Sequence, residues 1–156
     1  MIQEVLAEDE QYMNYALVLA EQAFEEGEVP IGAVVIKDGV VIGRGYNQVE
    51  MKENPTAHAE MIAIREASIK LLNWRLTDCT LYVSKEPCPM CAGAIYLSRI
   101  RRLVYGASDE KSGYAGSLHN TVQDARLNHH VDVVAGVLAD KSRDLLQKFF
   151  SDLRDK

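Results

Sequence analysis

The sequence predicts an α/β fold in which helices flank a central mixed sheet of five strands. Five short apolar segments alternate with segments that have helical periodicity. The first two apolar segments are separated by two residues, which only an antiparallel pair can use, whereas a helix-length stretch separates the third and fourth, which is typical of parallel strands. A sheet that contains both kinds of neighbour is mixed.

One domain over residues 1–156 is the prediction from size and composition. The chain has the length of a common single domain, with about half of its residues apolar and about a quarter charged. The N-terminus is acidic and lacks the basic start and the cleavage site of a secretory signal, and no apolar run reaches membrane-spanning length. We therefore expect a cytoplasmic protein.

An amphipathic helix and a hairpin are predicted first along the chain. Apolar residues recur at three- and four-residue spacing over 9–26, and Gly27 is placed to end that helix. Segments 31–37 and 40–46 are rich in valine and isoleucine, and Asp38-Gly39 between them favours a tight turn. These two segments are therefore predicted to pair as an antiparallel hairpin.

A polar loop and a second helix are predicted next. Residues 48–56 include Asn54-Pro55, which indicates a loop that delivers the chain into a helix. The helix is predicted over 57–72. His58 and Glu60 then fall in its first turn.

A βαβ unit is predicted in the middle of the chain. Residues 79–84 form a short strand that Glu86-Pro87 ends, 88–98 are helical, and 102–105 form the next strand. In such a unit the helix begins at the carboxyl end of the preceding strand. Cys88 is therefore predicted to open a helix as well.

The last third of the chain predicts a loop, a strand and a closing helix. Residues 106–120 are rich in glycine and serine and lack periodicity, so we expect a surface loop long enough to have a function. A strand is predicted over 131–137 and an amphipathic helix over 140–154. The inner side of that helix is expected to carry Leu145, Leu146, Phe149 and Leu153.

Charge neither supports nor excludes a nucleic-acid partner. The net charge is −6, but residues 1–36 hold eight acidic and no basic side chains, while the remaining 120 residues hold 17 basic and 15 acidic ones. A basic face is therefore possible outside the N-terminal segment. The candidates for facing phosphate are Arg99, Arg101, Arg102 and Lys111, with a solvated edge as the equally weighted alternative.

Two cysteines and one histidine have the spacing of a metal site. Cys88 and Cys91 stand three residues apart at a helix start, where they share a face and the N-terminus favours thiolates, and His58 opens the other helix. Sulfur and imidazole ligands favour zinc, and three protein ligands are typical of catalytic sites, which keep a position for water. Cys79 could be a fourth ligand, but a buried free cysteine is the expected interpretation.

Glu60 is the candidate for moving protons. It stands two residues from His58 on the same helix, so the two side chains point in different directions and Glu60 is poorly placed to share the metal. A carboxylate beside a zinc-activated water can instead take its proton and pass it to a nitrogen of the substrate.

The motifs resemble one family of zinc enzymes. His58-Ala59-Glu60 followed by Pro87-Cys88-Pro89-Met90-Cys91 is the H-x-E and P-C-x-x-C signature of zinc nucleobase deaminases. Nearly the whole chain resembles the bacterial tRNA-specific adenosine deaminases of the cytidine/deoxycytidylate deaminase superfamily. Further matching segments are Glu28-Val29-Pro30-Ile31-Gly32-Ala33-Val34, Asn47, Pro55-Thr56-Ala57, Gly106-Ala107, Asp109, Lys111 and Gly116-Ser117.

The resemblance implies a fold, a reaction and a set of binding residues. It implies a cytidine-deaminase-like three-layer sandwich, one zinc ion per subunit, a homodimer, and hydrolysis of adenosine to inosine at the wobble position of a tRNA anticodon, with release of ammonia. Substrate-binding roles carry over to Asn47 and Val29 for the flipped nucleoside, Ala59 and Pro87 for its polar edge, and Asp109, Lys111 and Phe150 for flanking nucleotides. Without the resemblance, some of these residues have an alternative interpretation. Asn47 would cap a strand end, Val29 would be a core residue, and Asp109 and Lys111 would be solvated loop charges.

Two other functions stay open from the sequence. A deaminase of free guanine, cytosine or cytidine would share the metal motif and Glu60, and would differ in the walls of its pocket. A zinc-stabilised binding module without catalysis would need a fourth ligand in place of water.

Overall fold

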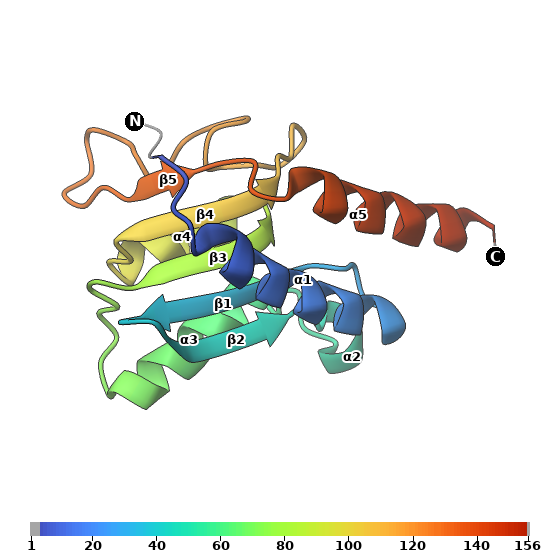
Figure 1. Cartoon of the computed structure of the whole chain (residues 1–156), viewed down its shortest axis with the longest axis horizontal. Helices are drawn as coiled ribbons and strands as arrows, with labels where there is room; N and C mark the ends of the chain where they lie inside the picture. The colour runs from blue at the N-terminus through green and yellow to red at the C-terminus, as the bar shows by residue number, and fades with distance from the viewer. Residues whose placement is uncertain (1–3, 156) are drawn as a thin grey trace.

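A five-stranded sheet lies between two layers of helices in the computed structural model, which describes residues 4–155 (Figure 1). Residues 1–3, part of the segment considered above for a secretory signal, and residue 156 lie outside the described residues. The strands are β1 (Gly32–Lys37), β2 (Val40–Tyr46), β3 (Thr80–Lys85), β4 (Arg102–Ala107) and β5 (Asp132–Val134). The helices are α1 (Asp9–Glu25), α2 (Val49–Lys52), α3 (Ala59–Leu71), α4 (Pro89–Leu97) and α5 (Ala139–Arg154).

The sheet is mixed, as predicted. Its strand order is β2-β1-β3-β4-β5, with β1 antiparallel to β2 and β3, and with β3, β4 and β5 parallel. The predicted hairpin joins β1 to β2, and its two turn residues, Asp38 and Gly39, have φ angles of 50° and 74°. Two successive positive φ angles match the right-handed twist of a hairpin, which explains the Asp-Gly pair.

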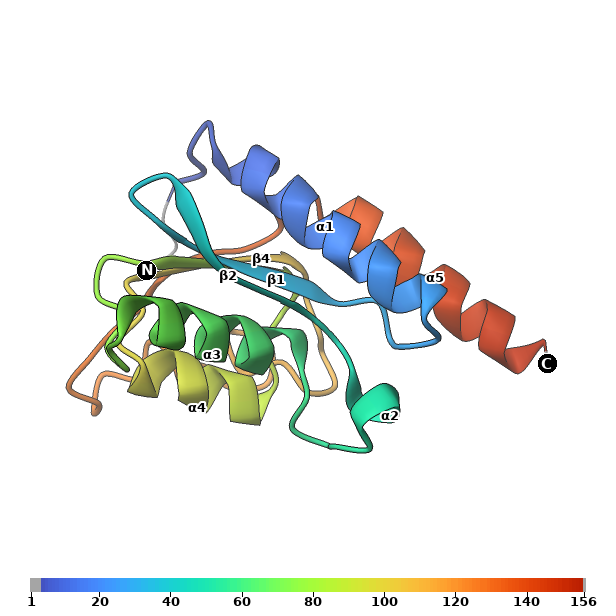
Figure 2. The ribbon, with the colours of Figure 1, turned by 90° about the horizontal axis from the view of Figure 1, so that it is seen from below.

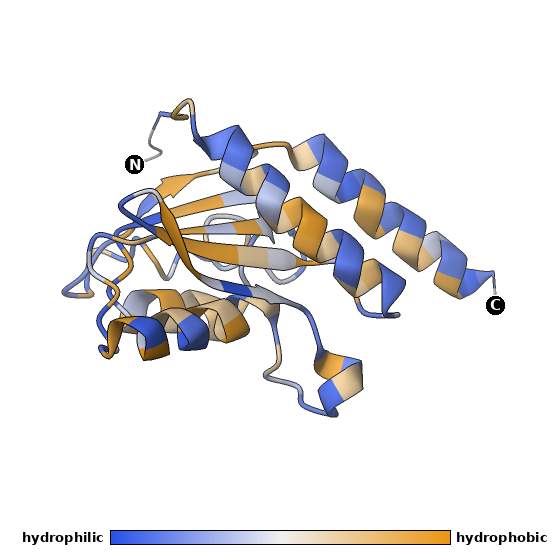
Figure 3. Cartoon of the chain, turned by 60° about the horizontal axis from the view of Figure 1, so that its bottom comes forward, coloured by the Kyte–Doolittle hydropathy of each residue, from blue (hydrophilic) through white to orange (hydrophobic). Residues whose placement is uncertain are grey.

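Alternate residues of each strand face the two helical layers. In β1, Ala33 and Val35 join the core under α3 and α4, whereas Val34 and Ile36 join the core under α1. Figure 2 shows α1 and α5 on one side of the sheet and α3 and α4 on the other, and in Figure 3 the strands between these layers are mainly hydrophobic. The predicted three-layer sandwich is therefore confirmed.

Glycines in β2 let α3 lie directly on the strand. A Cβ atom at Gly43 would collide with the backbone of Ala63, and one at Gly45 with the backbone of Ala59. Because β2 has no side chain at these two points, α3 approaches closely along its length. This contact fixes where the N-terminus of α3, and with it His58, sits relative to the sheet.

Three predicted boundaries differ from the structure by more than one residue. The helix predicted over 57–72 begins at Ala59, because His58 has the extended backbone of an N-cap residue, with φ −77° and ψ 152°. Gly106, predicted in the loop, belongs to β4. The strand predicted over 131–137 ends at Val134, because Gly136 has a φ of 85° and turns the chain so that it bonds the carbonyl of Tyr105.

Two further expectations need correction. The loop predicted over 48–56 contains the helical turn α2. On α5, Leu146 is buried but Leu153 is 55% exposed rather than inward-facing, since the C-terminal turns of α5 extend beyond the sheet (Figure 1). Over residues 4–155, no helix combines the length and apolar character needed to cross a membrane.

Candidate active site

Two helix N-termini bring together three side chains with donor atoms suited to a metal. His58 immediately precedes α3, Cys88 immediately precedes α4, and Cys91 lies in the first turn of α4. The Nδ1 atom of His58 lies 3.5 Å from the Sγ atoms of both cysteines, and all three donor atoms lie within 4.8 Å of one another. Within residues 4–155 no other group of three such side chains is arranged this closely.

These distances fit a tetrahedral zinc ion. With zinc–sulfur bonds of about 2.3 Å and zinc–nitrogen bonds of about 2.0–2.1 Å, a tetrahedral angle separates nitrogen from sulfur by about 3.6 Å. The observed separations are 3.5 Å. Cys79 does not join the group: it is buried in the core, as expected, and its thiol contacts the carbonyl of Thr77 at 3.6 Å.

The surroundings of the cluster favour a thiolate at Cys88. Hydrogen bonds from Cys91 and His58 lower the pKa of the Cys88 thiol to about 4, although burial opposes this shift. The hydrogen bond between His58 and Cys88 raises the pKa of His58. The hydrogen bond that Cys91 donates to Cys88 raises the pKa of Cys91. The N-terminus of α4 adds partial positive charge, which stabilises an anionic ligand set.

Glu60 lies beside this cluster and is buried. It occupies the first turn of α3 and is 4% exposed. Burial raises the pKa of its carboxyl group, which is within hydrogen-bonding reach of the Cys91 thiol. A carboxylate in this position is available to exchange a proton with a molecule held at the cluster.

A pocket of about 420 Å³ opens over Glu60 and His58, a size suited to a small ligand or one nucleoside. Its walls come from the segment before β1, the end of β2, the start of α3 and the C-terminal part of α5. Of the residues singled out from the sequence, it is lined by His58, Ala59, Glu60, Val29, Asn47 and Phe150. Three residues that were expected to bind the substrate do not line the pocket: Pro87, Asp109 and Lys111.

Asn47 joins two walls of the pocket. It is buried, its side-chain Nδ2 donates to the carbonyl of Val29 at 3.3 Å, and its Oδ1 accepts from the N–H of Val49 at 3.4 Å. Its own N–H donates to the carbonyl of Ile31 at 3.0 Å. These contacts are those of a strand-end cap, which was the alternative interpretation of Asn47 from the sequence. A side chain fixed in this way can also present its amide to a ligand.

Glu28 and Phe149 are among the pocket residues that were missed from the sequence. Glu28, quoted above only as part of a matching segment, is 1% exposed, and its carboxylate accepts the N–H groups of Glu50 at 3.0 Å and Met51 at 2.7 Å at the start of α2. Phe149, expected only as a core residue, stacks edge-on against Phe24 and lines the pocket. Neither role has a local signal, because the partners of both side chains are distant in the sequence.

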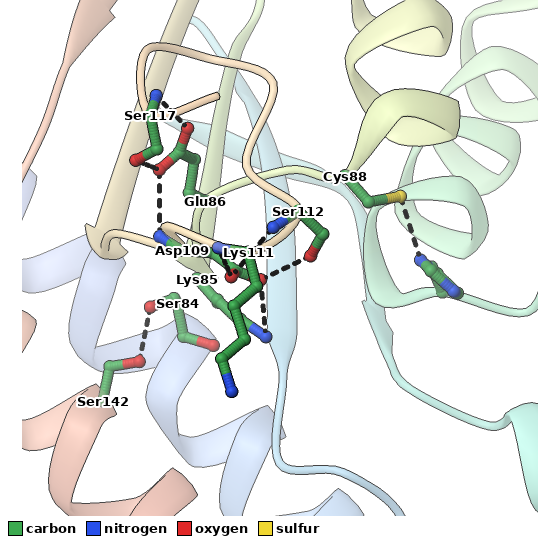
Figure 4. A network of polar contacts seen from close by, with 10 residues as sticks. Ser84, Lys85, Glu86, Cys88, Asp109, Lys111, Ser112, Ser117 and Ser142 are labelled. Carbon is green, nitrogen blue, oxygen red and sulfur yellow. Dashed lines mark hydrogen bonds and ion pairs between the residues drawn. The ribbon is translucent and has the colours of Figure 1, made fainter. Parts of the chain in front are cut away.

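Asp109 organises the loop that follows β4 (Figure 4). Its carboxylate accepts the N–H groups of Lys111 at 3.0 Å and Ser112 at 3.2 Å, and lies 3.0 Å from the ammonium group of Lys85. Burial acts against ionisation, but hydrogen bonds from Ser112 and Lys85 outweigh it and lower the pKa of Asp109 to about 2. The alternative of a solvated loop charge is therefore wrong for Asp109, while Lys111 is exposed.

The expectation of one basic surface built from the three arginines and Lys111 is wrong. Arg102 begins β4 and pairs in register with Thr80, the first residue of β3. The cysteine–histidine cluster lies beyond the last residue of β3, at the opposite end of that strand. The guanidinium group of Arg102 is moreover bound to buried Asp9 at 2.6 Å. The arginines therefore lie at the end of the sheet away from the pocket, and Lys111 lies at the pocket end.

Comparison with known proteins agrees with this arrangement. Residues 7–154 match the family described as MafB19-like deaminase. A tRNA-specific adenosine deaminase of Bacillus subtilis is 48% identical over 151 residues, which is 97% of this chain and 94% of that protein. One from Haemophilus influenzae is 48% identical over 149 residues, which is 95% of this chain and 86% of that protein.

A solved structure described as part of a study of A-to-I editing by tRNA:A34 deaminases at the wobble position has a TM-score of 0.84 and 44% identity, covering 87% of this chain and 99% of that one. The chain belongs to the tRNA-specific adenosine deaminase family. The tRNA-specific adenosine deaminase fold also extends to a guanine deaminase from Nitrosomonas europaea, with a TM-score of 0.81 and 29% identity over 95% of this chain and 87% of that one. The fold is therefore shared by enzymes with different substrates.

Proposed function

We propose that this protein is a zinc-dependent hydrolase that converts adenosine to inosine at the wobble position of a tRNA anticodon and releases ammonia. The observation that carries the proposal is the meeting of His58, Cys88 and Cys91 beside buried Glu60 at one end of a nucleoside-sized pocket. The supporting comparison is the 48% identity to a tRNA-specific adenosine deaminase over 97% of the chain.

His58, Cys88 and Cys91 would hold one zinc ion in each subunit. When bound there, zinc lowers the pKa of a coordinated water to about 7 and so supplies a nucleophile at neutral pH. Three protein ligands leave one tetrahedral position for that water. Among residues 4–155 no fourth side chain of the metal-binding types joins the group, which argues against a zinc-stabilised module without catalysis.

Glu60 would carry the protons of the reaction. It accepts a proton from the attacking water and passes it to a ring nitrogen of the adenine, so that the oxygen adds to C6 of the base. Glu60 then returns a second proton from the added hydroxyl to the amino group, which leaves as ammonia while the C6 oxygen becomes the carbonyl of inosine. Burial suits this role, because it keeps bulk water from exchanging with the transferred proton.

The walls of the pocket would hold the extruded nucleoside. Val29 packs against the base, Asn47 hydrogen-bonds the nucleoside, and the backbone at Ala59 binds its polar edge. The backbone at Pro87, which is not one of the pocket walls, is proposed to bind the same edge. Asp109, Lys111 and Phe150 would meet the flanking nucleotides outside the pocket. An anticodon loop is a suitable substrate, because its bases are already unpaired and can be extruded at little cost.

The direct test is ammonia release from purified, zinc-loaded protein. The substrates are an anticodon stem-loop with wobble adenosine, the same stem-loop with wobble guanosine, and free adenosine, guanine, cytosine and cytidine. We expect release from the adenosine stem-loop alone. Release from free guanine alone would favour the second candidate, a free-base deaminase, which the structural similarity to a guanine deaminase makes the main competitor.

We further propose a homodimer that works in the cytoplasm, where tRNA is modified. Apolar side chains at the surface of α3 and α4 support a second copy as partner: Ile69 is 62% exposed, Leu97 is 63% exposed, and Leu72 at the end of α3 is 92% exposed. Sedimentation of the wild type and of Leu97→Glu checks this, with dimer expected for the first and monomer for the second.

A further inference from the structure

Glu86 is a buried carboxylate whose bonds all go to one loop. It follows β3, is 3% exposed, and within residues 4–155 no lysine or arginine forms an ion pair with it. Its Oε1 atom accepts the N–H of Asp109 at 3.0 Å and the hydroxyl of Ser117. Its Oε2 atom accepts the N–H of Ala115 at 3.1 Å. It also accepts the N–H of Ser117 at 3.0 Å, a bond that Figure 4 shows.

The loop, residues 108–117, is shaped to receive this carboxylate. A Cβ atom at Gly113 would collide with the carboxyl group of Glu86 and with the backbone oxygen of Asp109. The glycine is therefore required for close approach rather than for a turn. A buried charge without a counter-ion is tolerated only where hydrogen bonds replace its hydration, so the four donors and Glu86 depend on one another.

The same contact joins the loop to the segment that carries Cys88. The N–H of Glu86 donates to the carbonyl of Ala107 at 2.8 Å, and the carbonyl of Pro87 accepts the N–H of Tyr114 at 2.9 Å. The chain before Cys88 and the loop after β4 are thus bonded side by side. None of residues 108–117 lines the pocket, so the loop is bonded to the segment before Cys88 without contributing to the pocket's interior.

We propose that Glu86 is a positioning residue for RNA recognition, which holds the 108–117 loop so that Asp109 and Lys111 face the nucleotides that flank the target base. The inference rests on the proposed tRNA substrate. It assigns Glu86 no part in the chemical step, because its carboxylate bonds point into the loop and not into the pocket. The consequence is that loss of Glu86 weakens binding of the RNA while a bound base is still turned over.

The kinetic test compares Glu86→Gln with the wild type on the anticodon stem-loop. The substitution keeps the shape but turns one acceptor oxygen into an NH₂ group that faces at least one backbone N–H, so at least one of the four hydrogen bonds is lost and the charge that the others stabilise is removed. We expect KM for the stem-loop to rise about tenfold while kcat stays within about twofold, which is the signature of lost binding. The matched control is Glu110→Gln, which removes one negative charge from the same loop at an exposed position, where the side chain has no hydrogen bond to any of residues 4–155.

A second readout does not depend on activity. Lys111 is the single lysine or arginine between Arg102 and Arg126, so trypsin can cut the loop at no other position. Release of the loop from Glu86 should raise the rate of cleavage after Lys111 about fivefold, since proteolysis follows local opening. The Glu110→Gln control should be cut at the wild-type rate.

Two milder variants keep the inference testable if Glu86→Gln does not fold. Ser117→Ala removes one donor, and Gly113→Ala pushes the loop away from the carboxylate, so both should change KM and cleavage in the same direction. Unchanged KM together with unchanged cleavage in these variants would overturn the inference. A fall in kcat with loss of bound zinc would also overturn it, because Glu86 would then act on the Cys88 segment. Wild type that is inactive on the stem-loop would instead reject the tRNA substrate, while the trypsin experiment would still report on the loop.

Discussion

Two buried carboxylates at opposite ends of the sheet differ in what surrounds them. Asp9 is fully buried, and Glu60 is 4% exposed. The pKa of Asp9 is lowered, whereas burial raises the pKa of Glu60. The same chemical group, equally removed from water, is therefore stabilised as an anion at one end and destabilised as an anion at the other.

The difference comes from the partners. Arg102 donates to both oxygens of Asp9, at 2.7 Å and 2.6 Å, the hydroxyl of Tyr82 donates at 2.7 Å, and the N–H of Leu6 donates at 2.7 Å. Burial opposes ionisation of Asp9, but these bonds outweigh it. Glu60 instead has the thiol of Cys91 as its side-chain neighbour and faces a pocket. A carboxylate held by an arginine and two further donors contributes to stability, and one that lies beside a pocket without a cationic side-chain donor is available for chemistry.

The largest effect should come from Glu60→Gln. The amide keeps the shape of the side chain but cannot accept and return a proton, so we expect kcat on the stem-loop to fall by about 10²–10⁴-fold. Bound zinc, measured by atomic absorption, and the melting temperature should stay at wild-type values. Activity that survives the substitution would remove Glu60 from the mechanism and end its contrast with Asp9.

At the other end, Asp9→Asn should affect stability alone. Removing the charge leaves the guanidinium group of Arg102, whose side chain is only 11% exposed, without its counter-ion. We expect the free energy of unfolding in urea to fall by about 2–4 kcal/mol, with kcat/KM of the folded enzyme within about twofold of wild type. A matching loss of activity would show that the two ends are coupled.

The contribution of Asp9 should also depend on pH. Because its pKa in the folded protein lies below the usual value of 3.8, the ionised form stabilises the fold fully above that value and loses its effect as the pH falls through the folded pKa. The difference in unfolding free energy between wild type and Asp9→Asn should therefore be constant near neutral pH and shrink in strong acid. A difference that grows with acidity would contradict the assigned ion pair.

The sequence was sufficient for what local patterns determine. Helical periodicity, the Asp38-Gly39 turn and the βαβ spacing predicted the sheet and its layers, because each of these features is set by neighbours along the chain. The spacing of Cys88 and Cys91 likewise predicted a shared face. His58 was a candidate third ligand because it opens the other helix, but its distance from the cysteines depends on how α3 packs against β2, which no local pattern determines.

What the sequence could not predict is the pairing of distant polar groups. Arg102 looked like a surface cation, and its partner Asp9 lies 93 positions away. Glu28 and Glu86 looked like ordinary acidic residues, and their backbone partners lie more than 20 positions away, in α2 and in the loop after β4. No propensity or periodicity carries such information, because the partners are brought together only by the sheet order.

The smallest predicted effects come from removing one exposed cation at each end of the sheet. Arg101 is exposed at the Asp9 end, with only a 3.8 Å contact to equally exposed Asp78, so Arg101→Gln should change the unfolding free energy by no more than about 0.5 kcal/mol. Lys111→Gln removes the same charge at the pocket end. If RNA is bound only there, Lys111→Gln should raise KM for the stem-loop about threefold and reduce its salt dependence, and Arg101→Gln should do neither. Equal effects of the two substitutions, in KM measured at several salt concentrations, would mean that the RNA backbone extends to the far end of the sheet.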